Sequence, residues 1–193
     1  MSESLHQPAV AAPPGNPSDD ALMALVREGD RVAFAHLVER HRHRAWAVAW
    51  RYTGSTEAAQ DLVQDAFLRV WENAGRYRGE GRFVGYLLRL LVNRALNLKR
   101  ASVREVTAEA PEPSGGESPE DRLERARHRQ AVVDAMQALP PSQRMALALR
   151  YQDDMSYEEI AAAMECSVKA VERLIARGRD GLRGRLAYLS TST

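Results

Sequence analysis

The chain has 193 residues and a formal net charge of +1 at pH 7, from 27 basic and 26 acidic side chains. This length allows one or two small domains, and the near balance of charge does not by itself indicate a nucleic-acid binder. The single cysteine, Cys166, excludes an internal disulfide framework and is typical of a reducing cytosol. No apolar stretch is long enough to span a membrane and no secretory signal pattern is present, so we expect a cytoplasmic protein without membrane insertion.

The first half of the chain reads as a short tail followed by helices. Residues 1–17 are rich in proline and small residues, which predicts a loose tail. Ser18 is a candidate N-cap for a first helix, and Asp19 and Asp20 in the first turn favour its dipole. From there to about residue 100, apolar side chains recur at three- and four-residue steps, with interruptions at Gly29, at Gly54 and over 75–81. The pattern predicts a four-helix domain over 18–100.

Composition changes sharply after residue 100. Residues 101–119 are rich in proline, glycine and acids, which predicts a flexible acidic linker that reaches roughly 60 Å at full stretch. A second helical block follows over 120–189, and strand alternation is missing throughout the sequence. The predicted fold class is therefore all-α, with two small helical domains joined by the linker.

The C-terminal block contains the pattern of a helix-turn-helix. Ser156 and Glu159 fit a capping box, and Ser167 can cap the next helix after a three-residue turn that starts at Glu165. That turn is expected to need a residue with positive φ, for which glutamate is unusual. The second helix places cations on one side and aliphatic residues on the other. A short helix, a tight turn and a cationic second helix fit insertion into the DNA major groove.

Side chains near the start of this second helix would reach base edges, and arginines further along would meet phosphates. The DNA-binding candidates are Ser167, Lys169, Ala170, Arg173, Arg177 and Arg179. The alternative is a solvated amphipathic hairpin whose arginines only aid solubility.

A second basic helix is predicted over 82–100, and the segment 76–104 carries eight bases and one acid. Asn and Arg supply directional hydrogen bonds, and the aromatic side chains Tyr77, Phe83 and Tyr86 supply flat faces for an unstacked base. This mixture fits single-stranded or melting DNA better than a closed duplex. The candidates are Arg76, Arg78, Arg82, Tyr86, Arg89, Asn93, Asn97 and Arg100. The alternative is a basic solvated helix with Phe83 and Tyr86 in the core.

The helix before that one has a polar side made of Asp61, Gln64, Asp65 and Arg69. This side does not resemble a DNA surface. It is either plainly solvated or a docking surface for a protein of complementary charge. Enzyme signatures are missing: the sequence has no phosphate-binding loop and no nucleophile elbow, and the spacing of His36, His41 and His43 does not favour a metal site. We expect neither catalysis nor a cofactor.

Three segments in series resemble one protein family. "DLVQDAFLRVW" (61–71) resembles the polymerase-binding helix of bacterial sigma factors of the extracytoplasmic-function type. "RYRGEGRFVGYLLRLLVNRALNLKR" (76–100) resembles their promoter-melting loop and helix, and the segment from "LPPSQRM" to "GLRGRL" (139–186) resembles their C-terminal helix-turn-helix domain. The resemblance covers nearly all of residues 18–189.

The resemblance implies a division of labour. The polar side with Asp61 and Asp65 would dock on the clamp coiled coil of the largest polymerase subunit. The loop and the helix over 76–100 would recognise and open the −10 promoter element, and the helix after Ser167 would bind the −35 element. The implied partners are core RNA polymerase, promoter DNA and an anti-sigma factor that holds the protein inactive. The residues alone leave two alternatives: an autonomous helix-turn-helix regulator with an N-terminal sensor domain, and a helical adaptor that binds only proteins.

Overall fold

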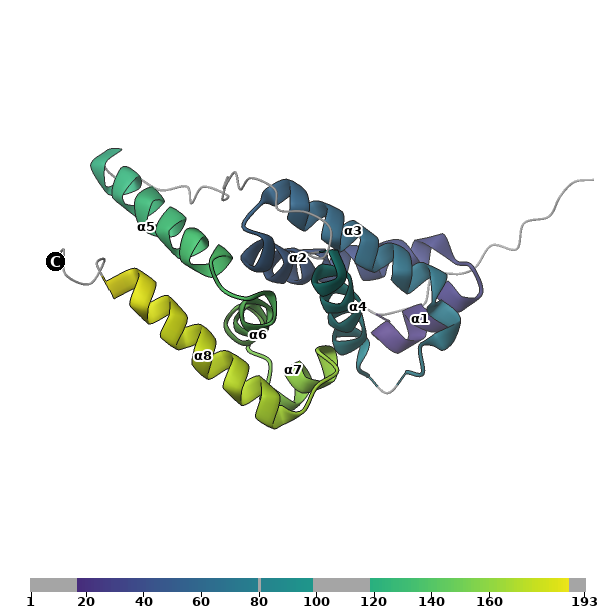
Figure 1. The fold of residues 1–193 in the computed structure, drawn as a ribbon. Helices are drawn as coiled ribbons and strands as arrows, with labels where there is room; N and C mark the ends of the chain where they lie inside the picture. Colours follow the sequence, from purple (N-terminus) through teal and green to yellow (C-terminus); the bar gives the residue numbers. More distant parts are fainter. Residues whose placement is uncertain (1–16, 80, 99–118, 188–193) are drawn as a thin grey trace, which may run out of the picture.

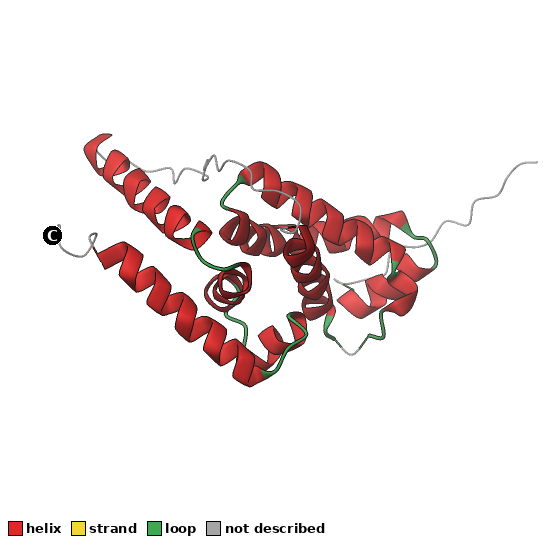
Figure 2. Cartoon of the chain, viewed as in Figure 1, coloured by secondary structure: helices red, strands yellow, loops and turns green. Residues whose placement is uncertain are grey.

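The computed structural model describes residues 17–79, 81–98 and 119–187, and every regular element within these ranges is a helix (Figures 1 and 2). The N-terminal bundle contains α1 (Asp19–Arg27), α2 (Arg31–Thr53), α3 (Thr56–Glu72), the 3-10 turn η1 (Ala74–Arg76) and α4 (Phe83–Leu98). The C-terminal bundle contains α5 (Pro119–Gln137), α6 (Pro141–Gln152), α7 (Tyr157–Ala163) and α8 (Val168–Leu186). These observations confirm the all-helical class. The tail over 1–16, most of the predicted linker (101–118) and Arg100 lie outside the described residues.

Helices begin where the local sequence supplies an acceptor for free backbone N–H groups. The Ser18 hydroxyl accepts from Ala21 N–H at 3.2 Å, and the Ser167 hydroxyl accepts from Ala170 N–H at 3.2 Å. The capping box at α7 is reciprocal, because Glu159 N–H donates to Ser156 Oγ at 3.2 Å and Ser156 N–H donates to Glu159 Oε2 at 2.7 Å. The predicted starts of α1, α7 and α8 are therefore confirmed.

The buried apolar side chains of the two bundles form one continuous core. In the N-terminal bundle the fully buried side chains come from all four α-helices and include Leu22, Leu37, Leu62, Phe83, Leu88 and Leu91. In the C-terminal bundle they include Met145, Leu149, Ile160, Val171 and Ile175. Helix α8 lies close to α6 because Gly178 has no side chain: a Cβ there would lie 2.8 Å from the Leu147 side chain. Among the described helices, none combines the length and apolar character needed to cross a membrane.

The two bundles pack against each other, which the prediction of two tethered domains did not include (Figure 1). Helix α2 contacts α5 and α6, and α4 contacts α7. Gly54 ends α2 in the left-handed conformation with φ of 70°, and a Cβ on it would lie 2.9 Å from both Val133 and Gln137 of α5. Glycine at this position therefore permits both the left-handed end of α2 and the close approach of the two bundles.

Hydrogen bonds and an ion pair also connect the two bundles. Arg44 of α2 forms a two-point ion pair with Asp153 after α6, with Nη2 of Arg44 at 3.0 Å from Oδ2 of Asp153. Arg51 Nη2 donates to Gln152 Oε1 at 3.0 Å. Two side chains of the C-terminal bundle, Gln137 and Arg144, donate to the carbonyl oxygen of Tyr52. These contacts hold the described parts of the chain in a closed arrangement.

Candidate nucleic-acid and protein interfaces

The cation row predicted on the last helix is exposed. Lys169, Arg173 and Arg177 are all solvent-accessible on α8, while Val171 and Ile175 of the same helix are buried against α6 and α7. Arg179 is also exposed, but it follows Arg177 by two residues and so lies on another side of the helix. The row is therefore open to a long anionic partner.

The residues at the start of α8 are placed by the turn before it. Glu165 has a φ of 52°, which confirms that this turn needs a left-handed residue. Ser167 is exposed, and its hydroxyl serves as the N-cap acceptor for Ala170 N–H. Burial raises the pKa of the half-buried Cys166 thiol, so this side chain is mainly in the unreactive thiol form at neutral pH.

The second predicted row lies on α4 and is only partly open. Arg89 and Asn97 are exposed, and Asn93 is half-buried. Tyr86 is also half-buried: its hydroxyl donates to the Asn73 carbonyl oxygen at 3.4 Å, and the Arg89 guanidinium lies 5.7 Å from the ring centre. Burial raises the pKa of Tyr86, against the lowering effect of Arg89 and Arg76. Tyr86 is therefore partly packed into the bundle and partly accessible, which lies between the solvated and the core interpretations.

The loop that precedes α4 adds further cations. Arg78 and Arg82 are exposed on the loop between η1 and α4, and Arg76 is exposed at the end of η1. All three lie next to the row that starts at Tyr86. Phe83 is buried, as expected for the first residue of a helix that packs into the bundle.

The C-terminal bundle faces this second basic surface across a cleft and leaves its arginines exposed. A cleft of about 880 Å³ lies between the two bundles. Its basic wall is formed by Arg44, Arg76, Arg78, Arg82 and Arg89, and its acidic wall by Asp153, Glu158 and Glu159. At the end of the same contact region, Asn93 Nδ2 donates to Glu165 Oε1 at 3.3 Å. In this arrangement the α4 surface faces acids of the same chain.

The four residues predicted to dock a protein are not equivalent. Asp61, Gln64 and Arg69 are exposed on α3. The carboxylate of Asp65 instead accepts a hydrogen bond from Arg94 Nε of α4 at 2.5 Å. Asp65 therefore contributes to the packing of α3 on α4 and presents only part of its charge to solvent.

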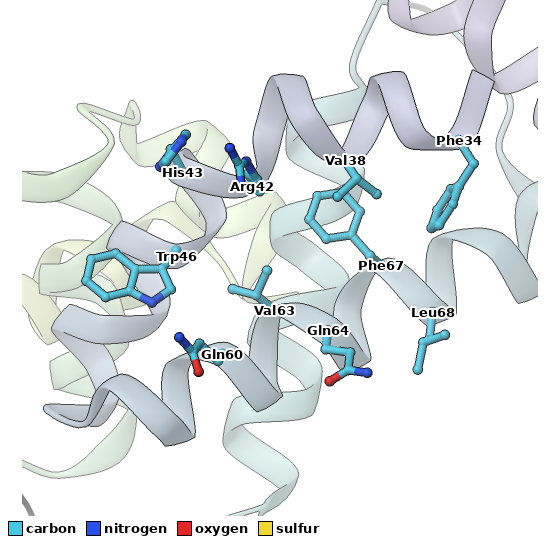
Figure 3. Close-up of a pocket in the computed structure, with 10 residues that line it drawn as sticks. All are labelled: Phe34, Val38, Arg42, His43, Trp46, Gln60, Val63, Gln64, Phe67 and Leu68. Carbon is cyan, nitrogen blue, oxygen red and sulfur yellow. The ribbon is translucent and has the colours of Figure 1, made fainter. Parts of the chain in front are cut away.

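An apolar groove lies beside these residues (Figure 3). It has a volume of about 630 Å³ and runs between α2 and α3, with Gln64 at its edge. Its apolar lining consists of Phe34, Val38, Trp46, Val63, Phe67 and Leu68, and Arg42, His43, Gln60 and Gln64 complete it. Leu68 is 49% exposed and adds accessible apolar surface next to the other apolar residues of the groove. A groove of this kind fits the side chains of a helical protein partner.

Sequence reasoning missed the groove because periodicity assigns residues to a face without showing what covers it. Phe34 and Trp46 fit the three- and four-residue apolar spacing of α2, which does not distinguish a groove lining from a core. The available signal was the width of the apolar face on α3, where Val63, Phe67 and Leu68 together exceed the stripe that one neighbouring helix can cover.

Comparison with known families gives two matches along the chain. A family model for sigma-70 region 2 matches residues 37–105, and a model for sigma-70 region 4 matches residues 129–181. The first match includes α3 and α4, and the second includes the helix-turn-helix.

Individual relatives agree with these matches. The chain is 34% identical to the ECF RNA polymerase sigma-E factor of Escherichia coli (strain K12) over 184 residues, which is 89% of this chain and 96% of the relative. It is 34% identical to the RNA polymerase sigma-H factor of Pseudomonas aeruginosa over 176 residues, which is 85% of this chain and 91% of the relative.

Two solved structures share the fold. The structure of CnrH in complex with the cytosolic domain of CnrY has a TM-score of 0.66 and 28% identity, covering 92% of this chain and all of CnrH. The sigma factor RpoE of Bartonella quintana, solved with the anti-sigma factor NepR, has a TM-score of 0.60 and 21% identity, covering 80% of this chain and 96% of RpoE.

Proposed function

The chain belongs to the extracytoplasmic-function sigma factors of the sigma-70 family, and from this premise we propose how its surfaces divide the work of promoter recognition. The protein directs core RNA polymerase to promoters and takes part in transcription initiation. It is an initiation factor and not an enzyme, so its residues act by binding. The single observation that carries the division of labour is the presence of two exposed basic surfaces on two bundles, with an apolar groove beside one of them.

The groove between α2 and α3 is the proposed polymerase-docking site. The clamp coiled coil of the largest subunit would place apolar side chains against Val63, Phe67 and Leu68. Asp61, Gln64 and Arg69 would supply polar contacts at the edge of the groove, where they affect the rate and orientation of docking. Burial of exposed apolar surface, including that of Leu68, would provide most of the affinity.

The −10 element is assigned to the loop before α4 and to the exposed side of α4. The loop arginines Arg76, Arg78 and Arg82 would hold phosphates, and Arg100, outside the described residues, would extend the surface. Tyr86 would stack on a base taken out of the duplex, and Asn93 and Asn97 would hydrogen-bond its edge. Unstacking a base costs a few kilocalories per mole, and these contacts would offset that cost.

The −35 element is assigned to α8. Ser167, Lys169 and Ala170 at the start of the helix would reach base edges in the major groove. The arginines further along, Arg173, Arg177 and Arg179, would contact phosphates. Each basic surface is small, and its phosphate contacts are screened by salt. When polymerase holds both surfaces in one complex, binding of the first promoter element would raise the effective concentration of the second surface at its own element.

The two domains must separate before both promoter elements are bound. The elements lie about two helical turns of duplex apart, roughly 70 Å. In the closed arrangement Asn93 of the −10 surface contacts Glu165 in the turn before α8, so the two surfaces adjoin. The connecting residues 99–118 reach roughly 65 Å at full stretch, which allows the separation. The domain limits proposed from the sequence, 18–100 and 120–189 with a linker over 101–119, fit this requirement.

Regulation by an anti-sigma partner is the remaining part of the proposal. Its support is that CnrH, at 28% identity over almost the whole chain, was solved with the cytosolic domain of a second protein bound. A partner that binds the closed form alone would stabilise it by mass action and keep the −10 surface facing the acidic wall of the C-terminal bundle. We place the activity in the bacterial cytoplasm, at the nucleoid.

Run-off transcription tests the proposal. Core polymerase plus this protein should give specific transcripts from a library of promoters of the host genome, and core alone should not. Gel shifts with and without core separate the alternatives. A sigma factor needs core for specific DNA binding, an autonomous regulator binds its site alone, and an adaptor binds no DNA. Specific binding to DNA without core would contradict the proposal.

A further inference from the structure

The first turn of α1 contains two adjacent acids that contact different parts of the N-terminal bundle. Asp19 contacts α2: its Oδ1 lies 2.5 Å from Arg40 Nη1, and its Oδ2 lies 2.9 Å from His41 Nε2. Asp20 instead contacts the loop before α4. Both acids favour the helix dipole equally, so helix capping does not explain why Asp20 reaches the loop.

Each carboxylate oxygen of Asp20 holds one end of that loop. Oδ1 accepts a hydrogen bond from the Tyr77 hydroxyl at 2.5 Å, and Oδ2 accepts from Gly81 N–H at 2.8 Å. Gly79 passes close over the same carboxylate, since a Cβ on Gly79 would lie 3.7 Å from Oδ2. Tyr77, Gly79 and Gly81 of this loop therefore lie around a single side chain of α1.

The protonation states of this pair are complementary. The hydrogen bond from Tyr77, followed by that from Gly81, lowers the pKa of Asp20, and burial together with the Asp20 carboxylate raises the pKa of Tyr77. At neutral pH the contact thus joins a carboxylate anion to a neutral phenol, which is a strong type of hydrogen bond.

The contact also determines where the DNA-facing side chains lie. Tyr77 is buried, with its ring centre 6.0 Å from that of Phe83 and 5.2 Å from that of Tyr86. Arg78 and Arg82 extend from the loop that Asp20 holds. An acid at a DNA surface would ordinarily repel phosphates, but here both oxygens are directed into the loop and accept hydrogen bonds from it.

We propose that Asp20 is a positioning residue for strand capture at the −10 element: it fixes Tyr77 and Gly81, so that the neighbouring arginines Arg78 and Arg82 and the ring of Tyr86 are in place before the strands separate. The inference rests on the proposed function of the loop and of α4. Asp20 itself does not touch DNA. Because the loop is already held by Asp20, it loses less conformational entropy when it binds a single strand.

The test uses the full chain assembled with core polymerase. Strand capture is measured as the affinity of the holoenzyme for a single-stranded −10 oligonucleotide and as the fluorescence of 2-aminopurine placed in the −10 element of a duplex promoter. Affinity for core polymerase, binding to a −35 duplex and thermal stability are measured on the same variants. Asp19→Asn is the matched control, because it removes the same charge from the same helix turn without touching the loop.

Asp20→Ala should weaken strand capture about tenfold, the size expected for loss of a charge-assisted hydrogen bond, with core affinity and −35 binding unchanged. Asp20→Asn should fall between this variant and the wild type, because its amide oxygen still accepts from Tyr77 while its NH₂ group cannot accept from Gly81 N–H. Tyr77→Phe should weaken capture less than Asp20→Ala, and the double variant should be less impaired than the product of the two single effects, since the residues act through one contact. Asp19→Asn should leave strand capture unchanged.

If Asp20→Ala captures the single strand as well as the wild type does, the inference is overturned but the proposed function is not. The same holds for an equal loss in Asp19→Asn, or for a loss that merely follows a fall in core affinity or thermal stability. If the wild-type chain with core fails to open any promoter, the proposed function itself is overturned and the inference with it.

Discussion

Arg144 of α6 donates a hydrogen bond to the carbonyl oxygen of Tyr52 at 3.2 Å, and its guanidinium carbon lies 5.4 Å from the centre of the Tyr52 ring. The two residues belong to different bundles, and Arg144 is only 1% exposed. Its Nη2 also donates to the carbonyl oxygens of Gln137 and Leu139, at 2.8 and 3.0 Å. Burial lowers the pKa of Arg144 and raises that of Tyr52. One buried cation thus joins the α5–α6 connection to the end of α2.

The closed arrangement can be tested at the ion pair of Arg44 and Asp153, which lies nearer the surface. Arg44→Glu places two acids against each other, and the Asp153 side chain is only 5% exposed, so the repulsion is poorly screened. We expect the radius of gyration of the free protein, measured by small-angle X-ray scattering, to increase. The charge-swapped variant Arg44→Glu with Asp153→Arg should return to the wild-type value. An unchanged radius in Arg44→Glu would show that the ion pair does not hold the bundles together.

The groove predicts which exposed leucine matters for the polymerase. Leu68→Asp should weaken core binding by about tenfold or more, because it places a charge in an apolar contact. The fold should be retained, since the side chain is half exposed already. Val32→Asp is the control: Val32 is 66% exposed on α2 but does not line the groove. Equal affinity of both variants for core would place the docking site elsewhere.

The row on α8 predicts a change in salt dependence. Arg173→Ala should reduce the slope of log affinity against log salt concentration by about 0.9, the value for one phosphate contact, when a −35 duplex is titrated with holoenzyme. Glu172→Ala alters the neighbouring exposed residue and should leave the slope unchanged. A slope that is the same in both variants and the wild type would exclude a phosphate contact by Arg173.

The contact between Tyr77 and Asp20 predicts a loss of stability at high pH. Because burial and the Asp20 carboxylate raise the pKa of Tyr77 in the folded state, its contribution is fully present below the unfolded pKa of about 10. It is lost as the pH rises above that value, where the unfolded chain releases the phenolic proton and the folded chain retains it. The free energy of unfolding of the wild type should therefore fall more steeply above pH 10 than that of Tyr77→Phe. Parallel curves for the two proteins would contradict the assignment.

The elements that the sequence predicts correctly depend on contacts between near neighbours. Ser18, Ser156 and Ser167 cap their helices through groups three residues away, so the signal is contained in a few letters. The left-handed Glu165 belongs to the same class, because the length of the turn requires positive φ whichever residue stands there. The exposed row on α8 follows from four-residue spacing alone.

The features that the sequence does not predict depend on distant partners. Arg144 and Tyr52 are separated by 92 positions, and the pattern around each gives no sign of the other. Gly54 is recognisable as a helix end, but its close approach to Val133 and Gln137 appears only once the bundles are packed. Asp20 reads as a helix-dipole acid for the same reason, since its loop contacts are with Tyr77 and Gly81.

The exposure of Lys169, Arg173 and Arg177 in the closed arrangement has a consequence for the protein that is not bound to polymerase. In the closed arrangement one basic surface faces acids of the same chain and the other faces outward, so we expect the free protein to keep a weak attraction for duplex DNA. This attraction would depend on the outward row alone, so it should fall steeply as the salt concentration rises.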